Sequence, residues 1–192
     1  MNDWRERYGP YALIAGASVG LGEAFARRLA ERGLDLLLIA RRQDALERLA
    51  ADLRARHAIQ VRTLVADLGR PDLREVVARA VDGIAVGLLV YNAAYSAIGP
   101  FVDRSLDEQL QVLNVNCRGP LVLSHLLGKA MAERGRGGIV LVTSVAGSQG
   151  GPWLASYAAS KAFNLVLAEG LWDELCERGV DVVACRAGAT LQ

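Results

Sequence analysis

The strongest constraint in this 192-residue sequence is an alternation, from end to end, of short apolar runs with longer amphipathic segments. The apolar runs are nearly continuous, as in parallel strands covered on both faces, and span residues 11–15, 35–40, 61–66, 86–91, 139–143 and 180–185. The segments between them have helical length and cover approximately residues 20–32, 42–57, 71–82, 106–134 and 155–178. This order predicts an α/β fold with a doubly wound parallel sheet, the Rossmann fold, in which ligands bind beyond the carboxyl ends of the strands.

Length and composition limit the remaining possibilities. A chain of 192 residues that is 52% apolar fits one domain, which we place at residues 1–192. The net charge of +1, with acids and bases interspersed, predicts no nucleic-acid or acidic membrane partner and favours a small molecule. No apolar run is long enough to span a bilayer and the N-terminus lacks a signal-peptide core, so we expect a cytoplasmic protein. Three cysteines without close pairing and two isolated histidines predict neither disulfides nor a metal site.

A glycine-rich turn follows the first predicted strand directly. It reads Gly16-Ala17-Ser18-Val19-Gly20-Leu21-Gly22 and opens the first long helix. Glycines allow the backbone to turn sharply and to approach a pyrophosphate, whose charge the helix N-terminus favours. Because the turn follows the first strand of a β-α series, we interpret it as a dinucleotide-binding loop rather than a mere tight connection.

Two arginines, Arg41 and Arg42, directly follow the second predicted strand. In a dinucleotide-binding fold, residues at this place contact the adenosine ribose and distinguish NAD from NADP. A carboxylate there would bind the 2′-hydroxyl of NAD, whereas a guanidinium can pair with the 2′-phosphate of NADP. We therefore predict NADP rather than NAD. The alternative is that both arginines only solvate the start of a helix.

Polar residues also end the third and fourth predicted strands. Asp67 and Asn92 lie where a cofactor would bind, although short polar side chains cap turns at such positions equally often. Within residues 106–134, Pro120 cannot donate to the carbonyl of Asn116, four residues earlier. We expect a kinked helix whose free Asn116 carbonyl can hold a water; two short helices meeting at Gly119-Pro120 are the alternative.

The chemistry of the chain centres on Ser144, Tyr157 and Lys161. With five tyrosines and two lysines in the chain, a chance Tyr four residues before a Lys is expected roughly 0.05 times. On a helix, residues four apart share a face, and Ser144 follows the fifth predicted strand at the same edge. A cation about 4 Å away contributes up to about 4 kcal/mol at an effective dielectric of about 20, which lowers a phenol pKa by roughly three. Tyr157 would then suit general acid-base catalysis.

Together these residues resemble the classical short-chain dehydrogenase/reductase family over about residues 8–192. The resemblance implies that Tyr157 is the acid-base residue, that Lys161 lowers its pKa and binds the nicotinamide ribose, and that Ser144 orients the substrate oxygen. It implies that Asn116, in an N-x-x-G pattern, completes a proton relay. Further positions that match the cofactor site are Gly16, Ser18, Gly20, Gly22, Asp67 and Asn92. Arg41 matches the position that selects NADP in similar proteins.

The chain also departs from that family. Ala15 replaces a threonine, the N-N-A-G turn reads Tyr91-Asn92-Ala93-Ala94, and Ala187 replaces a proline. Similar proteins continue beyond residue 192 into a substrate-covering segment and a seventh strand. We expect a longer polypeptide rather than a truncated form, because an open edge beside the sixth strand exposes apolar surface.

The resulting hypothesis is an NADP(H)-dependent oxidoreductase that interconverts a carbonyl and a secondary alcohol. Two alternatives stay open: reduction of a 3-ketoacyl thioester, and a non-catalytic regulatory or scaffold protein that binds the nucleotide. Trp153 and Leu154 either line an apolar pocket or pack against the next helix. By analogy with the family, helices 106–134 and 155–178 pair across a two-fold axis to give a homodimer or homotetramer.

Overall fold

Six parallel strands form one sheet in the order β3-β2-β1-β4-β5-β6. The computed structural model describes residues 4–188. The strands are β1 (Tyr11–Ala15), β2 (Asp35–Ala40), β3 (Val61–Val65), β4 (Val86–Tyr91), β5 (Gly137–Ser144) and β6 (Val180–Ala187). The order reverses direction beside β1, so the carboxyl ends of β1 and β4 flank the topological switch point, where this architecture places its ligand. The predicted doubly wound parallel sheet is confirmed.

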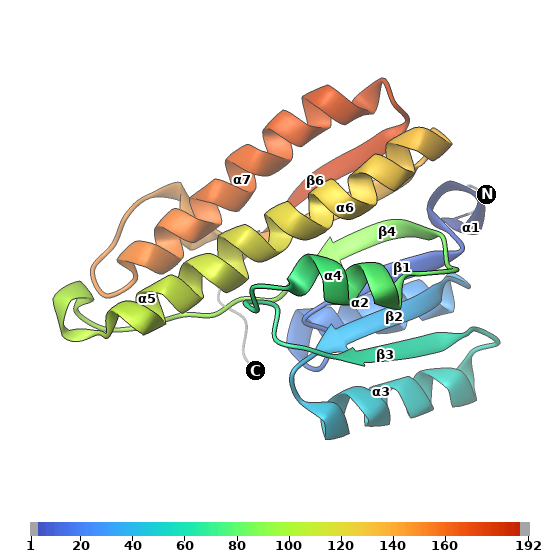
Figure 1. The fold of residues 1–192 in the computed structure, drawn as a ribbon, viewed down its shortest axis with the longest axis horizontal. Helices are drawn as coiled ribbons and strands as arrows, with labels where there is room; N and C mark the ends of the chain where they lie inside the picture. The colour runs from blue at the N-terminus through green and yellow to red at the C-terminus, as the bar shows by residue number, and fades with distance from the viewer. Residues whose placement is uncertain (1–3, 189–192) are drawn as a thin grey trace.

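Helices cover both faces of this sheet (Figure 1). They are α1 (Trp4–Tyr8), α2 (Gly20–Glu31), α3 (Gln43–Arg56), α4 (Leu73–Ala80), α5 (Leu106–Leu113), α6 (Gly119–Arg134) and α7 (Ala155–Cys176). The short helix α1 and the 3₁₀ turns at Phe101–Asp103 and Val145–Ser148 were not predicted, because segments this short carry no apolar period. No helix within residues 4–188 is both long and apolar enough to cross a membrane.

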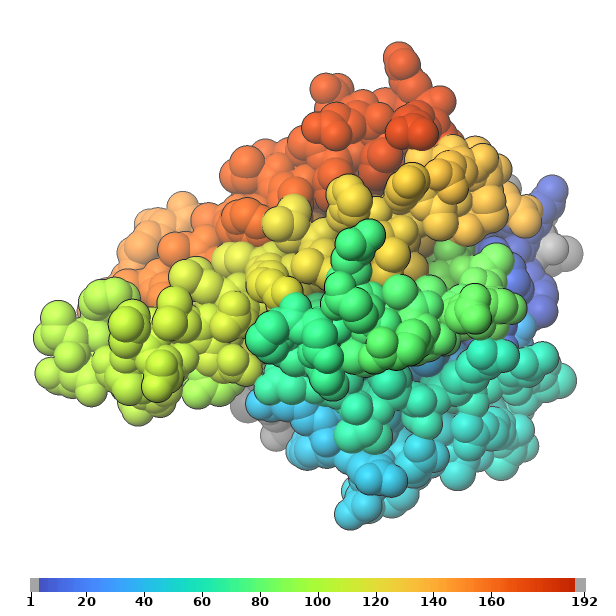
Figure 2. Space-filling view, in the orientation of Figure 1, coloured from blue at the N-terminus to red at the C-terminus, as the bar shows by residue number. Residues whose placement is uncertain are grey.

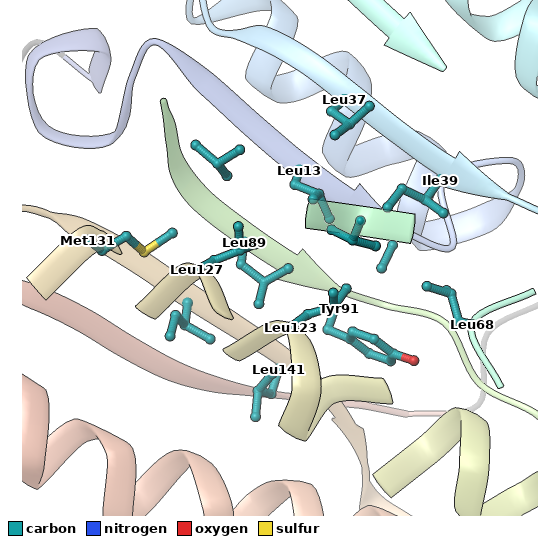
Figure 3. Packing of buried hydrophobic residues seen from close by; sticks show 14 of the residues in the cluster. Leu13, Leu37, Ile39, Leu68, Leu89, Tyr91, Leu123, Leu127, Met131 and Leu141 are labelled. Atoms are coloured by element: carbon teal, nitrogen blue, oxygen red, sulfur yellow. The ribbon is translucent and has the colours of Figure 1, made fainter. Parts of the chain in front are cut away.

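Side chains that alternate along the strands divide the core into two layers. Leu13 of β1 faces α4, α6 and α7, whereas its neighbours Ala12 and Ile14 pack toward α2 and α3. Figure 3 shows Leu123 and Leu127 of α6 over Leu89 and Tyr91 of β4, with Leu13 and Ile39 beyond them. The full burial of β1, β2 and β4 agrees with the expectation of strands covered on both faces.

The two edge strands depart from that expectation. Val65 at the end of β3 is partly exposed, and Val183 of β6 is 54% exposed. Val180 and Val182, whose side chains lie on the other face of β6 from Val183, are buried against the α7 side of the sheet. The face of β6 opposite α7 therefore leaves apolar surface open.

Pro120 produces a π-helical turn rather than a break between two helices. Residues Asn114–Arg118 form this turn, and α5, the turn and α6 follow one another without a loop. Pro120 has no N–H, so the carbonyls of Val115 and Asn116 receive no donor from it. Both carbonyls are satisfied by side chains: Tyr91 Oη donates to Val115 O at 2.6 Å, and Asn164 Nδ2 donates to Asn116 O at 2.9 Å. The prediction of a free Asn116 carbonyl is therefore wrong. A buried carbonyl without a partner is costly, and α7 supplies a donor to this one.

Candidate active site

A cavity of about 510 Å³ opens at the carboxyl ends of the strands. Nine of the predicted site residues line it: Gly16, Ser18, Gly20, Arg41, Asp67, Asn92, Ser144, Tyr157 and Lys161. They come from the turn after β1, from the ends of β2 to β5 and from the first turns of α7. Gly22 and Asn116 do not line the cavity and take part through their neighbours.

The glycine loop is shaped by close backbone contacts. Gly16 has a φ of 86°, and a Cβ there would lie 2.7 Å from the backbone of Ala93. A Cβ at Gly22 would lie 2.0 Å from the carbonyl oxygen of Gly16. Asn92 Nδ2 donates to that same oxygen at 3.0 Å, so Asn92 and Gly22 hold the loop rather than only contact a ligand.

The N-terminus of α2 presents backbone donors to the cavity. Val19, Gly20 and Leu21 line the cavity, and the N-cap residue Val19 has no side-chain oxygen to accept from the first-turn N–H groups. These groups and the helix dipole favour an anion in a helix of 12 residues. The loop therefore fits the pyrophosphate of a nicotinamide dinucleotide.

Cationic side chains lie beside this loop. Arg41 and Arg42 both line the cavity, and Arg42 Nη2 donates to Ser18 Oγ at 3.4 Å. Sequence reasoning selected Arg41 alone, yet it is Arg42 that contacts the loop. Asp67 shares its carboxylate between Gly69 N at 2.9 Å and Gln111 Nε2 at 3.3 Å, which ties the turn after β3 to α5.

Lys161 and Tyr157 lie together on α7. Lys161 is 2% exposed, its Nζ donates to Val142 O at 2.8 Å, and this nitrogen lies 5.7 Å from the centre of the Tyr157 ring. Burial of the ammonium lowers the pKa of Lys161 to about 8. Ser144, the last residue of β5, accepts from Ala146 N at 3.2 Å, which leaves its hydroxyl proton free to donate.

Asn116 joins α7 to the loop after β4. Its Nδ2 donates to Tyr95 O and to Ser160 Oγ, each at 2.9 Å, and its Oδ1 accepts from Tyr95 N at 2.8 Å. Ser160 Oγ in turn donates to Tyr157 O at 2.7 Å. Together with the Asn164 bond to its carbonyl, Asn116 fixes the helix that carries Tyr157 and Lys161.

Sequence reasoning missed Tyr95, Ser160 and Asn164. A signal existed for the last two: they are buried polar residues three residues after Tyr157 and three after Lys161, on the same helix. The role of Gly119 was also missed. A Cβ there would lie 2.0 Å from the hydroxyl of Tyr91, which is buried and whose pKa burial raises.

Within residues 4–188 no group of three or more His, Cys, Asp or Glu side chains could hold a metal ion. The three cysteines are unpaired: Cys117 and Cys185 are half-buried and Cys176 is exposed.

The chain matches the short chain dehydrogenase family over residues 10–191. It is 35% identical over 191 residues to a 7β-hydroxysteroid dehydrogenase of Clostridium sardiniense, covering 98% of this chain and 72% of that protein. It is 35% identical to a very-long-chain 3-oxoacyl-CoA reductase of Neurospora crassa, over 91% of this chain and 54% of that one.

Solved structures agree with this assignment. One, from a study of 7β-hydroxysteroid dehydrogenase stereoselectivity, superimposes with a TM-score of 0.94 at 32% identity, covering 97% of this chain and 72% of that chain. A short-chain dehydrogenase from Sphingobium yanoikuyae in complex with NADPH has a TM-score of 0.91 at 35% identity, covering 95% of this chain and 72% of that one. The protein thus belongs to the short-chain dehydrogenase family and is an oxidoreductase that acts on carbonyl and alcohol groups.

Proposed function

We propose that this protein reduces a ketone, or oxidises the corresponding secondary alcohol, with NADP(H) as the hydride carrier. The observation that carries the proposal is the single cavity that joins the glycine loop to Ser144, Tyr157 and Lys161. A phosphate-binding loop and a tyrosine-lysine pair have separate chemical uses. Their common cavity allows a bound nicotinamide and a substrate carbonyl to meet.

In this proposal the cofactor supplies the hydride, and the protein manages the charge on the substrate oxygen. Tyr157 Oη donates its proton to that oxygen as negative charge develops, and Ser144 Oγ donates a hydrogen bond to it. Lys161 Nζ, 5.7 Å from the centre of the Tyr157 ring, supplies the positive charge of the site on the same helix as Tyr157. Asn116 acts as a positioning residue, because its side chain is bonded to Tyr95 and Ser160 and its carbonyl to Asn164.

The decisive test of this mechanism is Tyr157→Phe. The change removes one hydroxyl from the cavity, so we expect kcat to fall by about 10²- to 10⁴-fold while the affinity for NADPH is kept. Tyr11→Phe is the matched control, because Tyr11 lies at the opposite end of the sheet and its hydroxyl donates only to Gln60. Turnover by Tyr157→Phe near that of the control contradicts the assigned role. Failure of the wild type to oxidise NADPH with any ketone favours the non-catalytic binder.

NADP is proposed over NAD because Arg41 and Arg42 both line the cavity and Arg42 Nη2 donates to Ser18 Oγ of the glycine loop. A charge-assisted contact with the 2′-phosphate is worth about 1.5–3 kcal/mol, so Arg41→Ala should weaken NADPH by about 10- to 100-fold. NADH, which lacks that phosphate, should change little. Arg48→Ala on the exposed side of α3 is the control. Equal losses for the two cofactors contradict a role in phosphate recognition.

Reduction of a 3-oxoacyl thioester is the second candidate, favoured by the 35% identity to the reductase of Neurospora crassa. The two candidates share all the chemistry described above and differ only in the groups that flank the carbonyl. Comparing kcat/KM for a 3-oxoacyl-CoA with that for simple ketones under the same conditions separates them. A preference for the thioester by more than about tenfold would support the second candidate.

Assembly into a homodimer or homotetramer is proposed from exposed apolar side chains on the outer helices. These side chains are Leu106, Leu110 and Leu113 of α5 and Phe163, Val166 and Trp172 of α7. Figure 2 shows α5, α6 and α7 forming one side of the molecule. Sedimentation of the wild type and of Val166→Asp tests the proposal: the charged variant should shift toward the monomer.

A further inference from the structure

Two side chains hold the turn that follows β3 against the helix that runs from α5 into α6 (Figure 1). Gln111 of α5 donates from Nε2 to Asp67 Oδ2 at 3.3 Å. Arg118 of the π-helical turn donates from Nη1 to Arg70 O at 2.7 Å and from Nη2 to Pro71 O. The turn is therefore fixed at two places, by an amide at its start and by a guanidinium at its end.

The carboxylate at the start of this turn belongs to the cavity. Asp67 lines the cavity, its Oδ1 accepts from Gly69 N at 2.9 Å and its Oδ2 accepts from Gln111. Both donors are neutral amide groups. An ionised carboxylate has about four lone-pair sites, so after these two bonds it can still accept from a ligand. The group that Asp67 can recognise in the cavity is thus an N–H or O–H donor and not a phosphate.

The position of β3 in the sheet indicates which part of a dinucleotide Asp67 meets. β2 and β3 lie on one side of β1, and β4 and β5 lie on the other. Ser144 ends β5, so in the proposed function the nicotinamide lies on the β5 side. The glycine loop after β1 lies between the two sides and fits the pyrophosphate, which directs the adenosine toward β2 and β3. Adenine carries an exocyclic amino group, which is an N–H donor of the kind that Asp67 can accept.

Gly69 leaves the space that the Gln111 amide needs to reach this carboxylate. A Cβ at Gly69 would lie 2.8 Å from Gln111 Nε2 and 3.0 Å from Gln111 Oε1. Gly69 does not have a positive φ, so the space and not the backbone conformation favours glycine here. With one bond to each oxygen, Gly69 N and Gln111 Nε2 together fix the plane of the Asp67 carboxylate.

We infer that Gln111 is a positioning residue for cofactor recognition. It holds the Asp67 carboxylate in the orientation in which a free lone pair accepts from the amino group of adenine. This inference rests on the proposed function and deepens it, because it assigns recognition of the base to a side chain outside the cavity lining. A carboxylate that is held before the cofactor arrives loses less conformational freedom on binding. The effect therefore belongs to cofactor affinity and not to hydride transfer.

The experiment measures, by fluorescence titration, the dissociation constants of NADPH and of the NADPH analogue whose base is purine, which lacks only the amino group. The wild type should bind NADPH about tenfold more tightly than the analogue. Gln111→Met keeps the side-chain length without a donor and should lower this ratio to about threefold or less, mainly by weakening NADPH. Gly69→Ala displaces the same amide and should lower the ratio as well. Arg118→Ala is the matched control, because both bonds to the Asp67 carboxylate stay in place, and it should keep the tenfold ratio.

The turnover number separates positioning of the cofactor from a general loss of structure. At saturating NADPH, kcat of Gln111→Met should stay within about twofold of the wild type while KM for NADPH rises. An unchanged affinity ratio in Gln111→Met overturns the inference, and so does an equal fall of the ratio in Arg118→Ala. If Gly69→Ala does not fold, Gln111→Met alone decides. A wild type that binds both cofactors equally also overturns the inference, while the proposed function stands. A wild type that does not bind NADPH removes the proposed function itself.

Discussion

Gly119→Ala is expected to destabilise this protein although alanine is the better helix former. Gly119 begins α6 directly after the π-helical turn, and an added Cβ would lie 2.0 Å from Tyr91 Oη and 2.9 Å from Tyr91 Cζ. Tyr91 is buried beneath α6, with its hydroxyl directed away from the sheet (Figure 3). The phenol cannot move aside without losing its bond to Val115 O.

The magnitude follows from three contributions. Overpacking a well-packed core costs about 1–3 kcal/mol, and leaving the buried Val115 carbonyl without a donor costs about 1–3 kcal/mol. Replacing glycine by alanine within a helix returns about 1 kcal/mol. The net loss in free energy of unfolding is therefore about 3 kcal/mol. For a chain of this size it corresponds to a fall in Tm of roughly 6–12 °C.

Urea and thermal denaturation followed by circular dichroism measure this loss. Gly170→Ala on α7 is the matched control, because a Cβ there meets nothing within 4 Å, and it should stabilise by about 0.5–1 kcal/mol. Adding Tyr91→Phe to Gly119→Ala removes the clashing hydroxyl, so the pair should be less destabilising than the sum of the single changes. If Gly119→Ala were as stable as Gly170→Ala, the predicted clash with Tyr91 would be refuted. Additive effects of Gly119→Ala and Tyr91→Phe in the double variant would refute it as well.

Three further predictions concern the site itself. Gly22→Ala should raise the dissociation constant for NADPH at least about tenfold, because its Cβ would lie 2.0 Å from Gly16 O and distort the loop; fluorescence titration measures this, and an unchanged constant contradicts it. The pKa of Lys161 is about 8 in the fold and ordinarily 10.5, so between these values the unfolded state binds more protons and stability rises with pH. Relative to Lys161→Met, the wild type should gain up to roughly 3 kcal/mol across that window in urea denaturation, and parallel pH profiles would contradict the shift. Asn164→Leu removes the donor to Asn116 O and should cost about 1–3 kcal/mol of stability in the same assay, whereas wild-type stability would show that another donor replaces it.

Much of the fold could be predicted from local patterns. The boundaries of β1, β2 and β4 agree with the apolar runs, and α2 and α3 end within one residue of their predicted ends. The glycine loop was found because it joins a strand to a helix. The side-chain periods of strands and helices repeat every few residues, so a short stretch of sequence is enough to predict the element.

Features that depend on contacts between distant segments could not be predicted. Asn116 and Asn164 are 48 residues apart, and no local pattern indicates that one donates to the carbonyl of the other. The expectation of a free Asn116 carbonyl was correct about the missing N–H of Pro120 and wrong about its consequence. The prediction failed because Tyr91 and Asn164 approach from other elements to supply the donors.

By itself, the sequence determined the order of strands and helices along the chain, the phosphate-binding loop and the spacing of Tyr157 and Lys161. Each of these features depends only on residues that are close together in the sequence. Only the tertiary structure decided that Lys161 is buried against Val142, that Arg42 contacts Ser18, and that Trp153 holds a left-handed backbone beside Gly99. The physical reason is that burial, hydrogen-bond partners and strain depend on which surfaces pack together. That packing is settled by the whole chain at once.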